Sequence, residues 1–273
     1  ILRNQLQYDV WSTETLQSWA WDPQVYNNLA GGALYGLMAR EFAPLPDRLK
    51  SAAARMEKVP ALLAQARENL VPARVPKPHA ETVAKQNAGI LSIVDTFITP
   101  HVKELPEADR QRLEAATETL KKAVSEHQAW LDKTLVPNAK GDFRIGAELY
   151  DQKLQFALLS SLSRADIKQR AEGELKRVRE EMYGIARTVL KDKANAPNAP
   201  DAPNSDDQQK VIEAALELAY AERPARDKVV PEAEAALATA TEFVRSKDLV
   251  TLPDAPVEII EMPEFQRGVA VAY

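Results

Sequence analysis

Apolar residues recur along most of the chain at steps of three, four and seven, the spacing that gathers them on one face of an α-helix. The clearest example is the segment 48–70, in which large apolar residues lie seven positions apart. They are Leu49, Met56, Leu63 and Leu70. Pro60 lies inside this pattern, and we expect it to kink or split the helix because proline has no backbone N–H to donate.

Segments with similar spacing predict a series of further helices. They cover residues 8–21, 23–40, 79–99, 106–136, 146–159, 163–190, 205–221 and 227–247. Some begin with a recognisable start signal: Pro23 follows Asp22, as at the first position of a helix, and Ser163-Arg-Ala-Asp166 has the form of a capping box. Short proline-marked loops between the segments predict helices that run antiparallel to their neighbours.

The last part of the chain has a different pattern. Residues 257–261 and 268–273 are short and rich in β-branched residues, which predicts strands. The sequence therefore predicts an all-α fold, a multi-helix antiparallel bundle or array with a short β segment at its C-terminal end. We expect a helical domain over 1–252 and the first strands of a sheet over 253–273.

Residues 194–204 form a low-complexity stretch with three prolines. Such a composition is typical of an exposed, semi-rigid loop that buries no apolar side chain. The sequence therefore predicts that this loop is the most mobile internal segment, and that it connects helices without dividing domains.

Composition narrows the classes of function. The formal net charge is −5, and no basic stripe with interleaved aromatic residues is present, which argues against a nucleic-acid partner. The chain has no cysteine, so disulfides, Cys-based zinc sites and thiol catalysis are excluded. No apolar run approaches the roughly 20 residues that a transmembrane helix requires.

The three histidines do not form a zinc-binding motif. His79, His101 and His127 fall on different predicted elements, and none belongs to a His-Glu-x-x-His segment. A catalytic zinc needs three protein ligands that converge on one point. We therefore expect no metal or other cofactor in this chain, and a packed His127 on an apolar helix face.

The turn 141–150 offers two candidate cleft residues, Arg144 and Tyr150. The planar guanidinium of Arg144 suits the binding of a carboxylate, although a structural role, in which it ties the turn to the end of a neighbouring helix, explains it better. Aromatic residues near the N-terminus could line a ligand groove, but core packing of two helices explains them better. They are Tyr8, Trp11, Trp19, Trp21 and Tyr26. Gly31, Gly32 and Gly36 favour close packing of helices in a core.

Two stretches carry a resemblance to a known family. Gly141-Asp-Phe-Arg-Ile-Gly-Ala-Glu-Leu-Tyr150 and Met262-Pro-Glu-Phe-Gln-Arg-Gly-Val-Ala-Val-Ala-Tyr273, together with the helix that follows Pro23, resemble the bacterial domain of unknown function 885 family. The resemblance implies a relative of the gluzincin-type zinc metallopeptidases, with helices around a deep cleft and a location in the periplasm or cell envelope. It also implies a zinc-binding His-Glu segment beyond the position of Tyr273, and a peptide substrate for the full-length protein.

Two hypotheses follow from these observations. In the first, the chain is part of a zinc-dependent peptidase-like hydrolase and is inactive by itself because it lacks the metal motif. In the second, it is a non-catalytic helical scaffold or binding module. If residues 257–273 begin a sheet without its remaining strands, they expose an apolar face through which the chain could dimerise.

Overall fold

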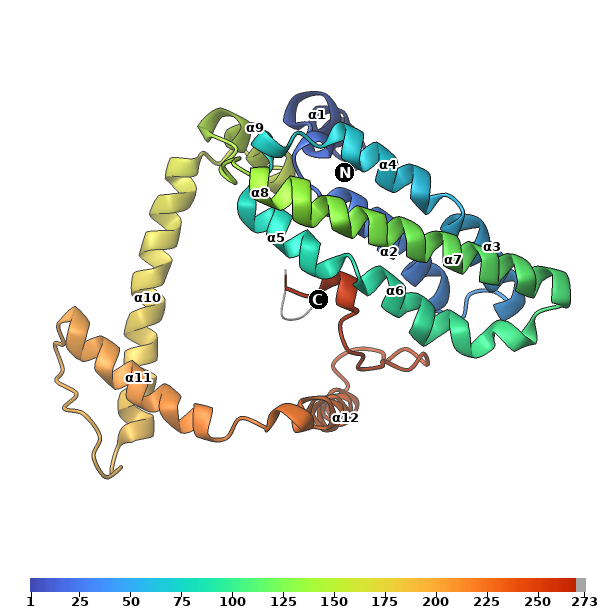
Figure 1. Ribbon diagram of the computed structural model, residues 1–273. Helices are drawn as coiled ribbons and strands as arrows, with labels where there is room; N and C mark the ends of the chain where they lie inside the picture. Colours follow the sequence, from blue (N-terminus) through green and yellow to red (C-terminus); the bar gives the residue numbers. More distant parts are fainter. Residues whose placement is uncertain (269–273) are drawn as a thin grey trace. The chain divides into compact units, whose positions relative to one another are not determined.

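A computed structural model describes residues 1–268, and over this range the protein is all α-helical, as predicted. Its contacts divide the chain into two compact units (Figure 1). Unit 1 comprises Ile1–Ser160 and Met262–Tyr273, and unit 2 comprises Ser161–Glu261. This division differs from the expected boundary at residue 252. The reason is that the C-terminal segment packs on the helices of unit 1, while residues 161–252 do not share that core.

Unit 1 is built from nine α-helices joined by short 3-10 and π-helical turns. They are α1 (Leu2–Trp11), α2 (Gln24–Met38), α3 (Leu45–Met56), α4 (Val59–Asn69), α5 (Lys77–Gln86), α6 (Gly89–Ile93), α7 (Glu107–Trp130), α8 (Val136–Asn138) and α9 (Ala147–Leu158). The expected helix 79–99 is interrupted between α5 and α6. At this break the buried side-chain amide of Asn87 donates to the Val124 carbonyl, 3.1 Å away, and to Gln128.

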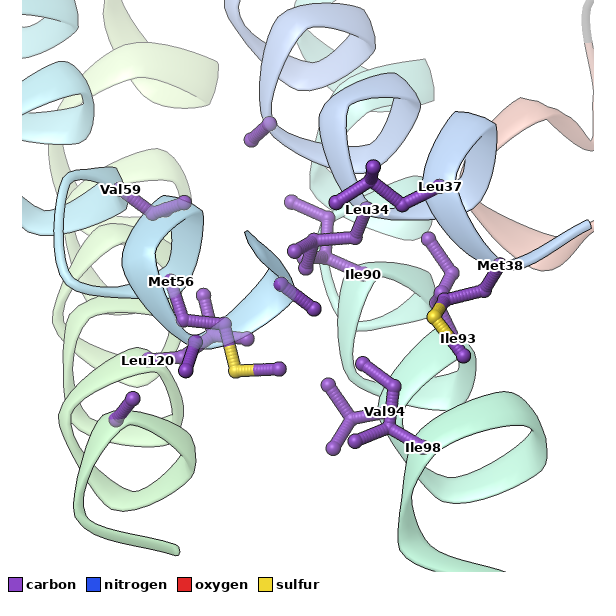
Figure 2. Close-up of a cluster of buried hydrophobic side chains, with 14 of the residues drawn as sticks. Leu34, Leu37, Met38, Met56, Val59, Ile90, Ile93, Val94, Ile98 and Leu120 are labelled. Atoms are coloured by element: carbon purple, nitrogen blue, oxygen red, sulfur yellow. The ribbon is translucent and has the colours of Figure 1, made fainter. Parts of the chain in front are cut away.

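The predicted apolar face of 48–70 forms part of the core of unit 1. Leu49, Met56, Leu63 and Leu70 are all buried. The segment is split into α3 and α4, and Pro60 lies in the first turn of α4, which confirms the predicted break. Helices α2, α3, α4, α6 and α7 enclose the larger apolar cluster, whose side chains interdigitate in Figure 2.

Unit 2 contains the long helix α10 (Arg164–Leu190), α11 (Ser205–Ala221) and α12 (Val229–Lys247). The predicted capping box is present: Ser163 and Asp166 bond each other's backbone N–H groups at the start of α10.

The apolar spacing in α10 predicts a buried stripe of Ile167, Ala171, Val178, Met182, Ile185 and Val189, but the buried face of this helix is a different one. Met182 and Ile185 are 37% and 59% exposed, whereas Tyr183, Ala186 and Leu190 pack against Val211 and Ile212 of α11. The helix was predicted correctly, but its neighbour covers the adjacent face.

The proline-rich loop 194–204 is tied to α10. The Tyr183 hydroxyl donates to the Pro200 carbonyl at 2.6 Å, and Arg187 pairs with Asp201 at 2.7 Å. Ala199 also packs on the small apolar cluster of unit 2. The expectation that this loop buries nothing apolar is therefore wrong, because a long helix alongside it supplies partners. Its mobility stays a prediction.

The expected strand at 257–261 is also wrong. These residues have no regular structure, and Val257 and Ile260 are exposed. A strand requires a partner strand to satisfy its backbone groups, and residues 257–261 have no such partner among the described residues. The second expected strand, 268–273, lies outside the described residues except for Gly268. No helix among the described residues is both long and apolar enough to cross a membrane.

Candidate functional site

The two cleft candidates from the sequence lie on the surface of unit 1. The backbone N–H of Arg144 donates to Oδ1 of Asp142 at 2.9 Å, and its guanidinium lies 4.3 Å from the centre of the Phe143 ring. Arg144 also pairs with Asp142 at 3.4 Å, so it stabilises its own turn rather than the end of a neighbouring helix. Tyr150 lies in the first turn of α9 and is about half exposed. Their role in a cleft stays a prediction.

The histidines lie apart in the structure. Nδ1 of His79 is 3.5 Å from Oδ1 of Asp22, and His101 pairs with Glu104 at 2.6 Å on an exposed turn. Within residues 1–268, no group of three or more His, Cys, Asp or Glu side chains could hold a metal ion. The described residues therefore do not fit a catalytic zinc.

His127 is a core residue, as the sequence indicates. It is 3% exposed and stacks on Trp130 with ring centres 5.5 Å apart. Burial, and next the nearby positive charge of Arg67, lower the pKa of His127 to about 4. Nδ1 of His127 and one terminal nitrogen of Arg67 are buried without a hydrogen-bond partner in the described part of the chain.

The most elaborate polar arrangement in unit 1 surrounds the C-terminal segment Met262–Arg267. Phe265 is completely buried, and its ring lies against Gly31 of α2 and 6.0 Å from the ring of Tyr35. A β-carbon on Gly89 of α6 would lie 2.4 Å from the backbone nitrogen of Phe265. The absence of side chains on both glycines therefore creates the space that the phenyl ring and its backbone occupy.

Two buried carboxamides hold the backbone of this segment. Nδ2 of Asn27 donates to the Phe265 carbonyl at 2.8 Å, and Nε2 of Gln86 donates to the Arg267 carbonyl at 2.6 Å. Both side chains belong to helices, α2 and α5, and are almost fully buried. We call the site formed by Asn27, Gly31, Gln86 and Gly89 the Phe265 socket.

The ends of the docked segment make further polar contacts. The hydroxyl of Ser92 donates to Oε2 of Glu264 at 2.5 Å. Nε of Arg267 donates to the Met262 carbonyl at 2.8 Å, and its guanidinium pairs with Glu264 at 3.7 Å. In Figure 1 the segment appears in red beside α6. The socket and Ser92 thus contact a ring, two carbonyls and a carboxylate of the segment.

Sequence reasoning missed this socket. Gly31 was assigned to close packing of helices, but it receives the Phe265 ring, whereas nothing lies within 4 Å of a β-carbon placed on Gly32 or Gly36. The available signal was a pair of carboxamides close to glycines on apolar helices. Asn27 precedes Gly31 by four residues, one helical turn, and Gln86 precedes Gly89 by three.

The N-terminal aromatic residues are distributed over two separate groups. Tyr8 and Trp11 of α1 pack with Phe156 of α9, and the indole N–H of Trp11 donates to Gln152 at 2.6 Å. Tyr26 is buried instead, and its hydroxyl donates to the Trp19 carbonyl. These contacts join helices of unit 1 and do not gather the aromatic residues around one groove.

An apolar groove of about 420 Å³ lies between α2, α3 and α4. Leu29, Ala33, Val59 and Leu62 are among the residues that line it, and Arg55 and Lys58 supply positive charge. Its size and lining are those of a small-ligand site.

The class of this protein follows from its helical fold, its docked C-terminal segment and its sequence. Residues 1–273 match the family described as a bacterial protein of unknown function, DUF885, and the chain belongs to this family. A solved structure from Shewanella oneidensis, described as that of a proposed lipoprotein of unknown function, is similar with a TM-score of 0.66 and 30% sequence identity. The match covers 93% of this chain and 45% of that chain, so the chain spans less than half the length of this relative. The comparison with curated proteins gives no match.

Proposed function

We propose that this chain is the helical, cleft-forming part of a zinc-dependent peptidase-like hydrolase. The observation that carries the proposal is the Phe265 socket, which fixes residues 262–267 on unit 1 directly before the stretch that resembles the start of the family's catalytic sheet. The length of the solved relative, more than half of which lies outside the match, supports a metal site elsewhere in a longer protein.

The roles in this proposal follow from the residues present. Since the described residues do not fit a zinc ion, the ligands are assigned to sequence outside residues 1–273, and this chain alone is inactive. Arg144 is exposed and can bind a peptide carboxylate, and Tyr150 offers a hydroxyl nearby in sequence. The proposed location is the cell envelope, in line with the description of the Shewanella relative as a proposed lipoprotein.

The test compares the 273-residue chain with a longer family protein that contains it. Elemental analysis and peptide hydrolysis are measured on both. We expect about one zinc per molecule and activity only in the longer protein, because a catalytic zinc requires three converging ligands. Zinc bound stoichiometrically to the short chain, or a zinc-free and inactive longer protein, contradicts the proposal.

The role of Arg144 is tested in the active longer protein. Arg144→Met should raise KM for peptides with a free C-terminal carboxylate by about tenfold, the effect of about 1.4 kcal/mol of lost binding. Lys140→Met in the same turn is the control and should leave KM unchanged. Equal KM values for the two variants would show that Arg144 does not bind the peptide carboxylate.

A second candidate function is a non-catalytic helical binding module. The groove between α2, α3 and α4 favours it, because an apolar floor with Arg55 and Lys58 suits an anionic amphiphilic ligand. Leu29→Glu should abolish binding of such a ligand if this proposal holds. Dimerisation through an apolar face at residues 257–273 belongs to the first proposal, in which the chain is part of a peptidase-like hydrolase, and sedimentation equilibrium of the chain tests it.

A further inference from the structure

Residues 262–267 are held on unit 1 in the way that a protein holds a bound peptide. Helix α12 ends at Lys247, and the described chain after it contains a 3-10 turn at Glu264–Gln266, a β-bridge residue at Arg267 and otherwise no regular structure. The helices bind the segment through carboxamide donors to its carbonyls and through one hole for an aromatic ring. These are the elements by which recognition sites hold a peptide: backbone bonds and a side-chain pocket.

The socket and the neighbouring Ser92 select the occupant through its ring and its carboxylate, whereas Arg267 makes contacts within the segment itself. The hole between Gly31 and Gly89 admits a flat ring and leaves no room for a β-carbon on either glycine. The hydroxyl of Ser92 donates a hydrogen bond to the carboxylate of Glu264, the residue before Phe265. Within the segment, Arg267 contacts the Met262 carbonyl and the Glu264 carboxylate. The bound sequence pattern is therefore an acid, a phenylalanine, one further residue and an arginine.

The walls of the socket are held by contacts that do not involve the segment. On α2, Ala30 and Leu34 flank Gly31 and are buried in the main core. On the opposite side of the socket lies Asn87, the residue after Gln86. Its side chain donates hydrogen bonds to the Val124 carbonyl and to Gln128 of α7. These contacts tie the walls of the socket to the core independently of the segment, which a site for exchangeable ligands requires.

One polar group in the socket is unused. Asn27 is 4% exposed, and its Oδ1 has no hydrogen-bond partner among the described residues, although its Nδ2 binds the Phe265 carbonyl. A buried acceptor without a donor is costly, on the order of 1–3 kcal/mol. A ligand that places a backbone N–H at this oxygen gains a bond that the chain's own segment does not make.

We propose that the Phe265 socket is a peptide-binding site that exchanges residues 262–267 for a peptide with the same acid–Phe–x–Arg pattern. The chain's own segment is tethered, so it competes at an effective concentration in roughly the millimolar range. An untethered peptide binds the wild-type chain weakly for that reason and binds strongly once the tethered ring is removed. This inference does not depend on the proposed hydrolase activity.

The test uses the full chain and a fluorescent peptide with the sequence of residues 260–268. Phe265→Ala empties the ring hole and leaves the socket residues in place. Fluorescence anisotropy should show saturable binding to this variant that is at least about tenfold tighter than to the wild-type chain, since the tethered competitor is weakened. A peptide with alanine in place of phenylalanine should not bind. Equal binding of both peptides, or none to the folded variant, overturns the proposal.

Two controls keep the test decisive. Circular dichroism establishes that Phe265→Ala is folded, and Phe265→Leu, which retains an apolar side chain, replaces it if it is not. A double-mutant cycle then examines the contact between Ser92 and the peptide carboxylate. Ser92→Ala in the Phe265→Ala chain should weaken the Glu-containing peptide several-fold, and should not affect a peptide with Gln at that position. Equal losses for the two peptides contradict recognition by this socket.

Discussion

The ring of Phe265 occupies the space in which a side chain on Gly31 would lie. A β-carbon placed on Gly31 falls 2.3 Å from Cδ2 of Phe265, far inside van der Waals contact. The two residues come from opposite ends of the sequence, yet the size of the side chain at one position limits the size of the side chain at the other. A helix of unit 1 and the C-terminal segment are therefore matched in shape at one position.

Gly31→Ala tests this match, because an added methyl group must displace the ring or the helix. We expect a loss of about 1–3 kcal/mol in the free energy of unfolding from overpacking, partly offset by the higher helix propensity of alanine, about 1 kcal/mol. Gly32→Ala in the same helix is the control: it faces open space and should gain stability by up to about 1 kcal/mol. Urea unfolding measures both. Equal stability of the two variants shows that the ring moves aside without cost.

Arg48 supports the second prediction, since it binds the backbone at the end of α2. Its side chain is 7% exposed; Nε donates to the Ala43 carbonyl at 2.9 Å and a terminal nitrogen to the Arg40 carbonyl at 3.0 Å. Arg48→Lys keeps the charge but cannot reproduce this fork of donors. We expect it to destabilise the protein by about 2–4 kcal/mol, because the buried carbonyls of Leu37 and Met38, to which Arg48 also donates at 3.3 Å, lose their partner.

The control for Arg48→Lys is Arg55→Lys. Arg55 also donates to a carbonyl, that of Ala33, but from an exposed position where water can replace it. Thermal unfolding should show a small change, below about 1 kcal/mol, for this variant. A similar loss in both variants contradicts a special role for the buried guanidinium.

Helix periodicity predicted the fold of unit 1 well where one helix has one buried face. The residues at steps of seven between Leu49 and Leu70 are buried as expected, and Pro60 marks the start of α4. Periodicity was less informative for α10, where Met182 and Ile185 fit the apolar spacing but Tyr183 and Ala186 are the buried residues. Which face is covered depends on where α11 crosses, and local sequence does not contain that information.

The Phe265 socket could not be predicted for a related reason. Gly31 and Gly89 are small because a distant segment approaches them, and a single sequence shows only that they are glycines. Likewise, the strand expected at 257–261 had suitable β-branched residues but no partner strand in the described chain. Strand formation depends on pairing over long distances, whereas helix formation depends largely on the segment itself.

Tyr183 provides a third prediction, on the proline-rich loop. Its hydroxyl donates to the Pro200 carbonyl at 2.6 Å, while its ring remains buried against α11. Tyr183→Phe should remove the bond to the loop and leave the apolar packing intact, at a cost of about 1 kcal/mol. Limited proteolysis should then cut residues 194–204 several times faster than in the wild-type chain, while the melting temperature falls by only a few degrees. Tyr220→Phe, at an exposed position on α11, is the control and should leave the cleavage rate unaltered.

The fourth prediction concerns acid stability and His127. Burial and Arg67 lower the pKa of His127 from 6.5 to about 4, so between these two values the unfolded chain binds a proton that the folded chain does not. Stability therefore falls as the pH drops through this window and is unaffected by His127 above it. At 1.36 kcal/mol for each pKa unit, the contribution reaches about 2 kcal/mol by pH 4.5 and about 3 kcal/mol below pH 4.

Carboxylates also titrate in this range, so the measurement is a comparison between variants. Urea unfolding of the wild-type chain and of His127→Asn is carried out at pH 7 and pH 4.5. The wild-type chain should lose about 2 kcal/mol more than the variant between the two values, because asparagine does not titrate. If His127→Asn loses as much stability in acid as the wild-type chain does, His127 accepts a proton in the folded state without penalty. The unpaired Nδ1 beside Arg67 would then have to be accessible to water.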